Sequence, residues 1–108
     1  MNILDKIGMS IFHTGYYLWE EAIEIFKNEM KKDKINIKDK KYYVTKLNME
    51  DIYKELAKKH NMTRSAVEKD MRTAMNKIED LKEKLDTEYK ITNKKFLILL
   101  LQKYGGKK

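Results

Sequence analysis

Two arginines, Arg64 and Arg72, lie eight residues apart in the segment NMTRSAVEKDMRTAMNKI, residues 61–78. They are the only arginines among the 24 basic residues of the chain, and all the others are lysines. A planar guanidinium can form paired hydrogen bonds to a base edge or to a phosphate, which a lysine ammonium cannot. Unless the two clustered by chance, their position predicts a contact that needs this bidentate geometry.

The composition fits a partner with many negative charges. With 108 residues, the chain is long enough for one domain, residues 1–108, with one hydrophobic core. Its net charge of +7 suits nucleic acid or an acidic membrane surface. Solubility alone is the other reading of this charge.

Several classes of function are not expected. The chain has no cysteine, which removes disulfides, thiolate zinc sites and cysteine nucleophiles. His13 and His60 have no metal-ligand spacing, and no glycine-rich phosphate loop occurs, so we expect no enzyme, no cofactor and no metal. The start has no signal-peptide pattern, and the apolar run 96–101 is too short to span a bilayer. We therefore expect a cytoplasmic protein without a membrane partner.

The few helix breakers predict an all-α fold. Proline is absent and only four glycines occur. Five to six helices are expected in one domain, with a small hairpin or a basic loop near residues 35–45. The expected helices are 3–7 before Gly8, 11–31 capped by Ser10, 49–60 capped by Asn48, one from Thr63 or Ser65 to about Lys84, and one from Thr92 or Asn93 to Gly105.

Two details of packing follow from these helices. Gly15 inside a helix predicts a close backbone approach there. Tyr16, Tyr17 and Trp19 are expected in the core, and the run 96–101 in the core or at a protomer interface. The lysine-rich segment 31–46 is either a solvated loop or a contact to a nucleic-acid backbone.

Residues 49–84 match the requirements of a helix-turn-helix. Ala57 supplies the small residue where the two helices cross, and Asn61 can adopt the left-handed backbone of the turn. In the second helix one face is apolar. The common helix-turn-helix pattern prefers an apolar residue at the position of Asp70, and here Met71 takes that packing role. The members of this stripe are Val67, Met71, Ala74, Ile78, Leu81 and Leu85. The opposite stripe holds Ser65, Lys69, Arg72 and Asn76, as a recognition helix over residues 64–84 in the major groove requires.

Three blocks resemble a known family. They are LDKIGMSIFHTGYYLWEEAI (4–23), LAKKHNMTRSAVEKDMRTAM (56–75) and ITNKKFLILLLQK (91–103), in the right order over most of the chain. They are similar to the C-terminal DNA-binding effector domain of the stage zero sporulation master response regulator of Firmicutes. The resemblance implies an all-helical domain that binds a short DNA box, often as a homodimer of tandem protomers, and contacts the sigma subunit of RNA polymerase.

The resemblance also has departures. The second block keeps Ser65, Val67, Glu68, Arg72 and Ala74 of the family pattern. Lys69 and Ala66 stand where the family has arginines, and Thr73 where it has histidine, so an altered box preference is expected. The family's receiver domain has no counterpart in these 108 residues, so regulation by abundance or by competition with the full-length regulator is expected in place of phosphorylation.

The residues expected to contact DNA lie at the start and on the outer face of the second helix. Arg72 is expected to read a guanine edge or to bind a phosphate. Glu68 either accepts from a cytosine amine or closes a capping box with Ser65. Thr63 and Arg64 suit a phosphate at the helix start. The full candidate set is Thr63, Arg64, Ser65, Glu68, Lys69, Arg72, Thr73 and Asn76.

Two functions fit these observations. The first is a sequence-specific regulator of transcription that binds double-stranded DNA. The second is an interaction protein or antagonist that binds a sigma factor or the full-length sporulation regulator without specific DNA binding. The departures at Ala66, Lys69 and Asp70 leave the second function open.

Overall fold

The computed structural model describes residues 3–33 and 47–104, and these residues are helical without any strand. The all-α prediction is therefore confirmed, whereas the hairpin or loop expected near residues 35–45 lies outside the described residues. The six described helices are α1 (Ile3–Ile7), α2 (Thr14–Lys32), α4 (Met49–His60), α5 (Arg64–Asn76), α6 (Leu81–Lys84) and α7 (Asn93–Tyr104).

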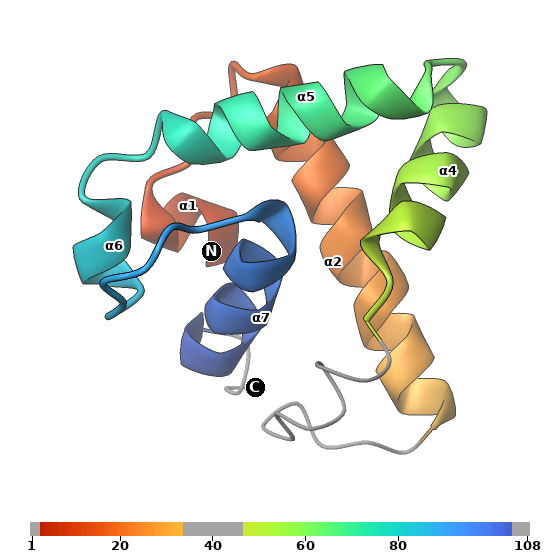
Figure 1. Ribbon diagram of the computed structural model, residues 1–108. Helices are drawn as coiled ribbons and strands as arrows, with labels where there is room; N and C mark the ends of the chain where they lie inside the picture. Colours follow the sequence, from red (N-terminus) through yellow and green to blue (C-terminus); the bar gives the residue numbers. More distant parts are fainter. Residues whose placement is uncertain (1–2, 34–46, 105–108) are drawn as a thin grey trace.

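Helix α5 lies across one end of the molecule and packs on three other helices. Figure 1 shows it running over the start of α2, with α4 descending from one end and α7 beneath it. Its closest packing is with α2, followed by α4 and α7. One long side of α5 is therefore covered by protein, while the opposite side faces outward.

A single hydrophobic core lies under α5. The predicted stripe is confirmed for Val67, Met71 and Ala74, which are at most 1% exposed. Trp19 of α2 is fully buried and meets the ring of Phe96 edge to face, with ring centroids 4.7 Å apart. Such aromatic pairs add about 1 kcal/mol to the free energy gained by burying their area. The core thus joins α2, α5 and α7.

The crossing of α2 over α5 depends on Gly15. A Cβ atom added to Gly15 would overlap the carbonyl oxygen of Asp70 and lie 2.7 Å from the Cβ of Ala74. One turn further along α2, the indole nitrogen of Trp19 donates to the carbonyl oxygen of Met71 at 2.7 Å. The predicted close approach at Gly15 is confirmed, and its partner is the backbone of α5.

Helix α2 starts later than predicted. Ser10 was expected to cap a helix from Ile11, but its hydroxyl accepts from the backbone N–H of Phe12 at 3.1 Å and closes a turn instead. The helix begins at Thr14. The turn leaves Ile11 and Phe12 exposed, while Met9 beside it is buried.

Helix α5 ends earlier than predicted. The recognition helix was expected to reach about Lys84, but α5 stops at Asn76 and Asp80 adopts a left-handed backbone, with φ of 53°. A straight helix would carry Leu85 about 13 Å beyond Asn76, past the core. The turn and α6 instead bring Ile78 and Leu85 back, to 6% and 3% exposure.

The remaining predictions concern the ends of the chain and its aromatic residues. Gly8 has φ of 93° after α1, as a helix-ending glycine should, and Thr92 accepts from the backbone N–H of Lys95 at the start of α7. The apolar run 96–101 belongs to the core, with four of its six residues fully buried. The prediction for Tyr17 is wrong, since its side chain lies on the outer side of α2 and is 51% exposed.

We predict that Gly15→Ala lowers the free energy of unfolding by about 3 kcal/mol, because the added methyl group must push apart two helix backbones. Thermal unfolding followed by circular dichroism measures this loss. The matched control is Asn28→Ala, an exposed position of the same helix, which should leave the midpoint nearly unchanged. Equal midpoints for Gly15→Ala and the natural sequence would contradict the close approach.

Candidate nucleic-acid interface

The turn between α4 and α5 is built by local hydrogen bonds. Asn61 adopts the left-handed conformation, with φ of 55° and ψ of 47°. The backbone N–H groups of Asn61 and Met62 both donate to the carbonyl oxygen of Ala57, and Ala57 itself is 8% exposed. The left-handed turn predicted at Asn61 is confirmed, and α4 and α5 form a helix-turn-helix. The role of Ala57 at the crossing of the two helices stays a prediction.

Thr63, rather than Ser65, caps α5. The hydroxyl oxygen of Thr63 accepts from the backbone N–H of Ala66 at 3.0 Å. A capping box would then need a glutamate at Ala66, so the box expected between Ser65 and Glu68 is wrong. The carboxylate of Glu68 is bound by two arginines of its own helix instead.

The outer face of α5 is polar and open. The predicted stripe is confirmed as exposed, and the apolar residues of the same helix lie in the core. Every third or fourth position along the outward side therefore presents a donor or acceptor. The exposed members of the candidate set on this helix are Ser65, Lys69, Arg72, Thr73 and Asn76.

Arg64 is held by two carboxylates and an aromatic ring. Its Nε donates to Oε1 of Glu50 at 2.7 Å, and its Nη2 binds the other oxygen of the same carboxylate. Its Nη1 donates to Oε1 of Glu68 at 2.5 Å, and its guanidinium carbon lies 4.9 Å from the ring centre of Tyr53. The hydrogen bonds from Arg64 lower the pKa of Glu50, and those to Glu50 and Glu68 raise the pKa of Arg64.

Arg72 is held much more loosely. Its Nη1 lies 3.6 Å from Oε2 of Glu68, and its side chain is 52% exposed. An exposed ion pair of this length contributes little to stability. Of the two arginines, Arg72 is therefore the one whose guanidinium can move to another partner at small cost.

Two further polar groups tie the helix-turn-helix to its supports. Asn93, at the start of α7, is buried and its Nδ2 donates to the hydroxyl of Tyr53 at 3.0 Å and to the carbonyl oxygen of Glu68 at 3.4 Å. Sequence reasoning treated Asn93 only as one possible helix cap. Its role as a link from α7 to both α4 and α5 depends on residues 40 and 25 positions away, which no local pattern contains.

Glu21 of α2 binds the end of α4. Its two carboxylate oxygens lie 2.6 Å from Nζ of Lys59 and 2.7 Å from Nε2 of His60. The ring of His60 is therefore hydrogen-bonded, and its side chain is 35% exposed. Burial alone would raise the pKa of Glu21, but the hydrogen bonds from Lys59 and His60 outweigh it and hold the pKa below its ordinary value.

Sequence reasoning missed Phe12, which lies beside the outer face of α5. Its side chain is 92% exposed, and it lines a shallow hollow with His13, Asp70 and Thr73. His13 stands at the cap position of α2 without a side-chain cap bond. Phe12 lies inside the first block of the family resemblance, and no sequence pattern marked its side chain as exposed.

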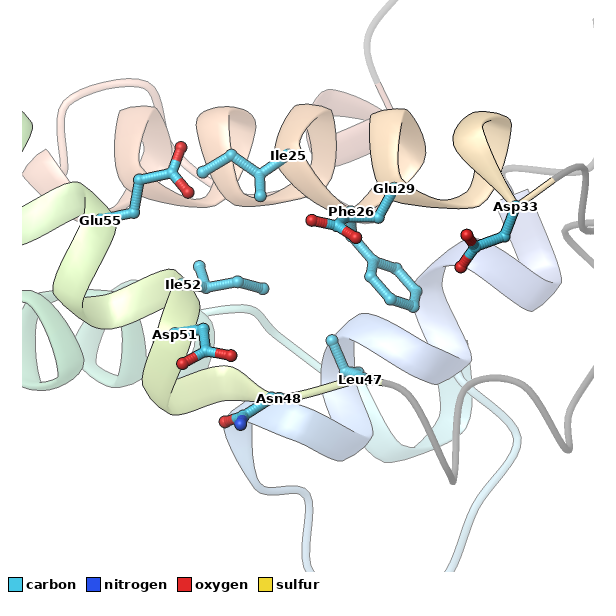
Figure 2. A pocket seen from close by; sticks show the side chains of 9 residues that line it. All are labelled: Ile25, Phe26, Glu29, Asp33, Leu47, Asn48, Asp51, Ile52 and Glu55. Atoms are coloured by element: carbon cyan, nitrogen blue, oxygen red, sulfur yellow. The ribbon is translucent and has the colours of Figure 1, made fainter.

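A groove of about 300 Å³ lies between α2 and the start of α4, away from α5. Figure 2 shows the carboxylates of Glu29, Asp33, Asp51 and Glu55 around it, with Ile25 and Ile52 between them. None of its nine lining residues is basic. This groove is not a phosphate site.

Residues 3–33 and 47–104 contain no cluster of three histidine or carboxylate side chains that could hold a metal ion. No helix in this part of the chain is long and apolar enough to cross a bilayer. Comparison of the chain with protein-family models, curated proteins and solved structures finds no match.

We predict that Glu21→Gln lowers stability by about 1 kcal/mol near neutral pH, because Lys59 and His60 lose a charged acceptor. Since the folded pKa of Glu21 lies below the ordinary 4.5, its stabilisation is complete above that value and is lost as pH falls through the folded pKa. Urea unfolding between about pH 6 and pH 3 should show a shallower acid loss in the variant than in the natural sequence.

Glu24→Gln is the control, at an exposed glutamate of the same helix. If Glu21→Gln and Glu24→Gln gave the same profile, the contact between α2 and the end of α4 would have no energetic role.

Proposed function

We propose that the protein is a sequence-specific regulator of transcription that binds double-stranded DNA with α5 in the major groove. The observation that carries the proposal is the division of α5 into two faces. Val67 and Met71 are fully buried against the rest of the domain, while Lys69 and Arg72 between and beyond them are exposed. A recognition helix in a helix-turn-helix has this division.

The open face supplies groups that suit bases and phosphates. Arg72 is the residue that reads a guanine edge, because its guanidinium is exposed and only loosely paired. Lys69 and Asn76 contact bases or phosphates on either side of it. The start of α5 at Thr63 is exposed, and a phosphate can bind at such a helix start. The net charge of +7 favours approach to DNA.

The family resemblance adds partners to this proposal. A short DNA box, a second protomer of this chain on the same DNA and the sigma subunit of RNA polymerase are the partners that it implies. The replacement of family arginines at Ala66 and Lys69 implies a box that differs from that of the family.

One observation favours the second function, an interaction protein that does not read DNA. Two of the charged side chains on α5, Arg64 and Glu68, already bind each other, and Arg64 also binds Glu50. This pairing leaves Lys69 and Arg72 as the cations of the outer face of α5. A sigma factor or the full-length regulator would then be the target.

The deciding experiment is a titration onto a labelled duplex that carries the family's box and onto a scrambled duplex, at two salt concentrations. A box preference that persists at the higher salt supports the sequence reader. Equal binding to both duplexes that is lost with salt means that charge alone drives association. Absence of binding to both, with capture of the sigma subunit, supports the interaction protein.

We predict that Arg72→Ala lowers the preference for the box over the scrambled duplex by about 1–3 kcal/mol, because a bidentate contact to guanine is lost. Fluorescence anisotropy with both duplexes measures this preference. Lys103→Ala is the control, which removes one positive charge from the exposed side of α7 and should leave the preference unchanged. An equal loss of affinity for both duplexes in Arg72→Ala would assign Arg72 to a phosphate.

A further inference from the structure

The partners of Arg64 leave it poorly placed to bind a phosphate. Three of its nitrogens, Nε, Nη1 and Nη2, each donate to a carboxylate oxygen, and the flat guanidinium also lies over the ring of Tyr53. Two of these partners, Glu50 and Tyr53, belong to α4, while Glu68 lies one turn along α5. A phosphate would have to displace Glu50 or Glu68 to reach this group.

We propose that Arg64 is a positioning residue, which fixes the first turn of α5 against the start of α4 and does not itself bind DNA. The inference rests on the proposed function, because it assigns a role within DNA reading. Arg64 is the first residue of α5, directly after the connecting turn, and it binds Glu50 in the first turn of α4, at the end of that helix away from the turn. The angle between the helices is thereby fixed by a bond outside the turn.

The geometry explains why this position holds an arginine in a chain that otherwise uses lysine. The fork of the guanidinium matches both oxygens of the Glu50 carboxylate, and its third nitrogen reaches Glu68. Its flat face can also lie over an aromatic ring. A lysine ammonium is a point charge and cannot satisfy two carboxylates and a ring in one plane.

The same arrangement keeps Arg72 available. Arg64 and Arg72 bind different oxygens of Glu68, at 2.5 Å and 3.6 Å. Because Arg64 is the closer partner, it neutralises most of the charge of this carboxylate. Without Arg64, Glu68 would pair with Arg72 and hold that side chain on the surface of α5. Removal of Arg64 should therefore weaken DNA reading through Arg72.

The first test is a double-mutant cycle in unfolding, without DNA. The variants are Arg64→Gln, Arg64→Lys, Glu50→Gln and the double variant Arg64→Gln with Glu50→Gln. We expect each single variant to lower the midpoint by a few degrees, and the double variant to unfold at the midpoint of Arg64→Gln, because the two changes break the same bond. We also expect that Arg64→Lys does not restore the midpoint of the natural sequence. Unchanged midpoints in the single variants, or a double variant whose loss equals the sum of the two single losses, would overturn the positioning role of Arg64.

The second test is the salt dependence of binding to the box, at a temperature far below unfolding. If Arg64 binds no phosphate, Arg64→Gln keeps the slope of log K against log salt, while the box preference falls about tenfold as one base contact weakens. Glu50→Gln then binds no more tightly than the natural sequence. A slope reduced by about 1 in Arg64→Gln, with tighter binding by Glu50→Gln, would make Arg64 a phosphate contact instead.

The two tests separate this inference from the proposed function. Lys69→Gln is the matched control, since it removes a cation from the open face of α5 without touching the Arg64 contacts, and its slope should fall by about 1. If the natural sequence shows no box preference, the proposed function fails, and the unfolding cycle still decides whether Arg64 anchors α5 to α4.

Discussion

The backbones of α2 and α5 approach each other closely where the two helices cross at Gly15. Without a side chain there, the backbone of α2 rests directly on the carbonyl oxygen of Asp70 and the methyl group of Ala74. The indole of Trp19 then reaches the carbonyl oxygen of Met71 and the ring of Phe96, so one residue bonds α5 and packs on α7. Since interiors are close-packed, the position of α5 is determined by this approach. The face of α5 that points outward is decided at the same point.

The orientation of α4 relative to α5 is held at both ends. At the turn, Asn61 and Met62 return two N–H groups to Ala57, and Thr63 caps the next helix. At the start of α4, Glu50 is bound by Arg64, the first residue of α5. Asn93 adds a third tie, from α7 to Tyr53 and to the backbone of α5. Bonds of different chemistry therefore link α4 and α5 to each other and to α7.

The two arginines of α5 differ in how tightly other side chains of the protein bind them. Arg64 is bound within the domain, and Arg72 shares the remaining oxygen of Glu68 at a longer distance. Two arginines on one short helix thus differ in how freely they can bind another partner, and residue type alone would not indicate this. The acidic groove between α2 and α4 lies away from this face, so the positive charge of the chain is not uniformly distributed over the described surface.

The sequence by itself determined the helices, the turn and the inner face of α5, because these depend on local rules: periodicity for Val67 and Met71, backbone freedom for Asn61 and Gly8, and capping for Asn48 and Thr92. The end of α5 at Asn76 and the exposure of Tyr17 depended on where the core stops. The partners of Arg64 and Asn93 depended on residues far away in the chain. Only the tertiary structure decided these, because the energy of a polar side chain is set by the groups that folding brings to it, and a pattern in the sequence contains none of them.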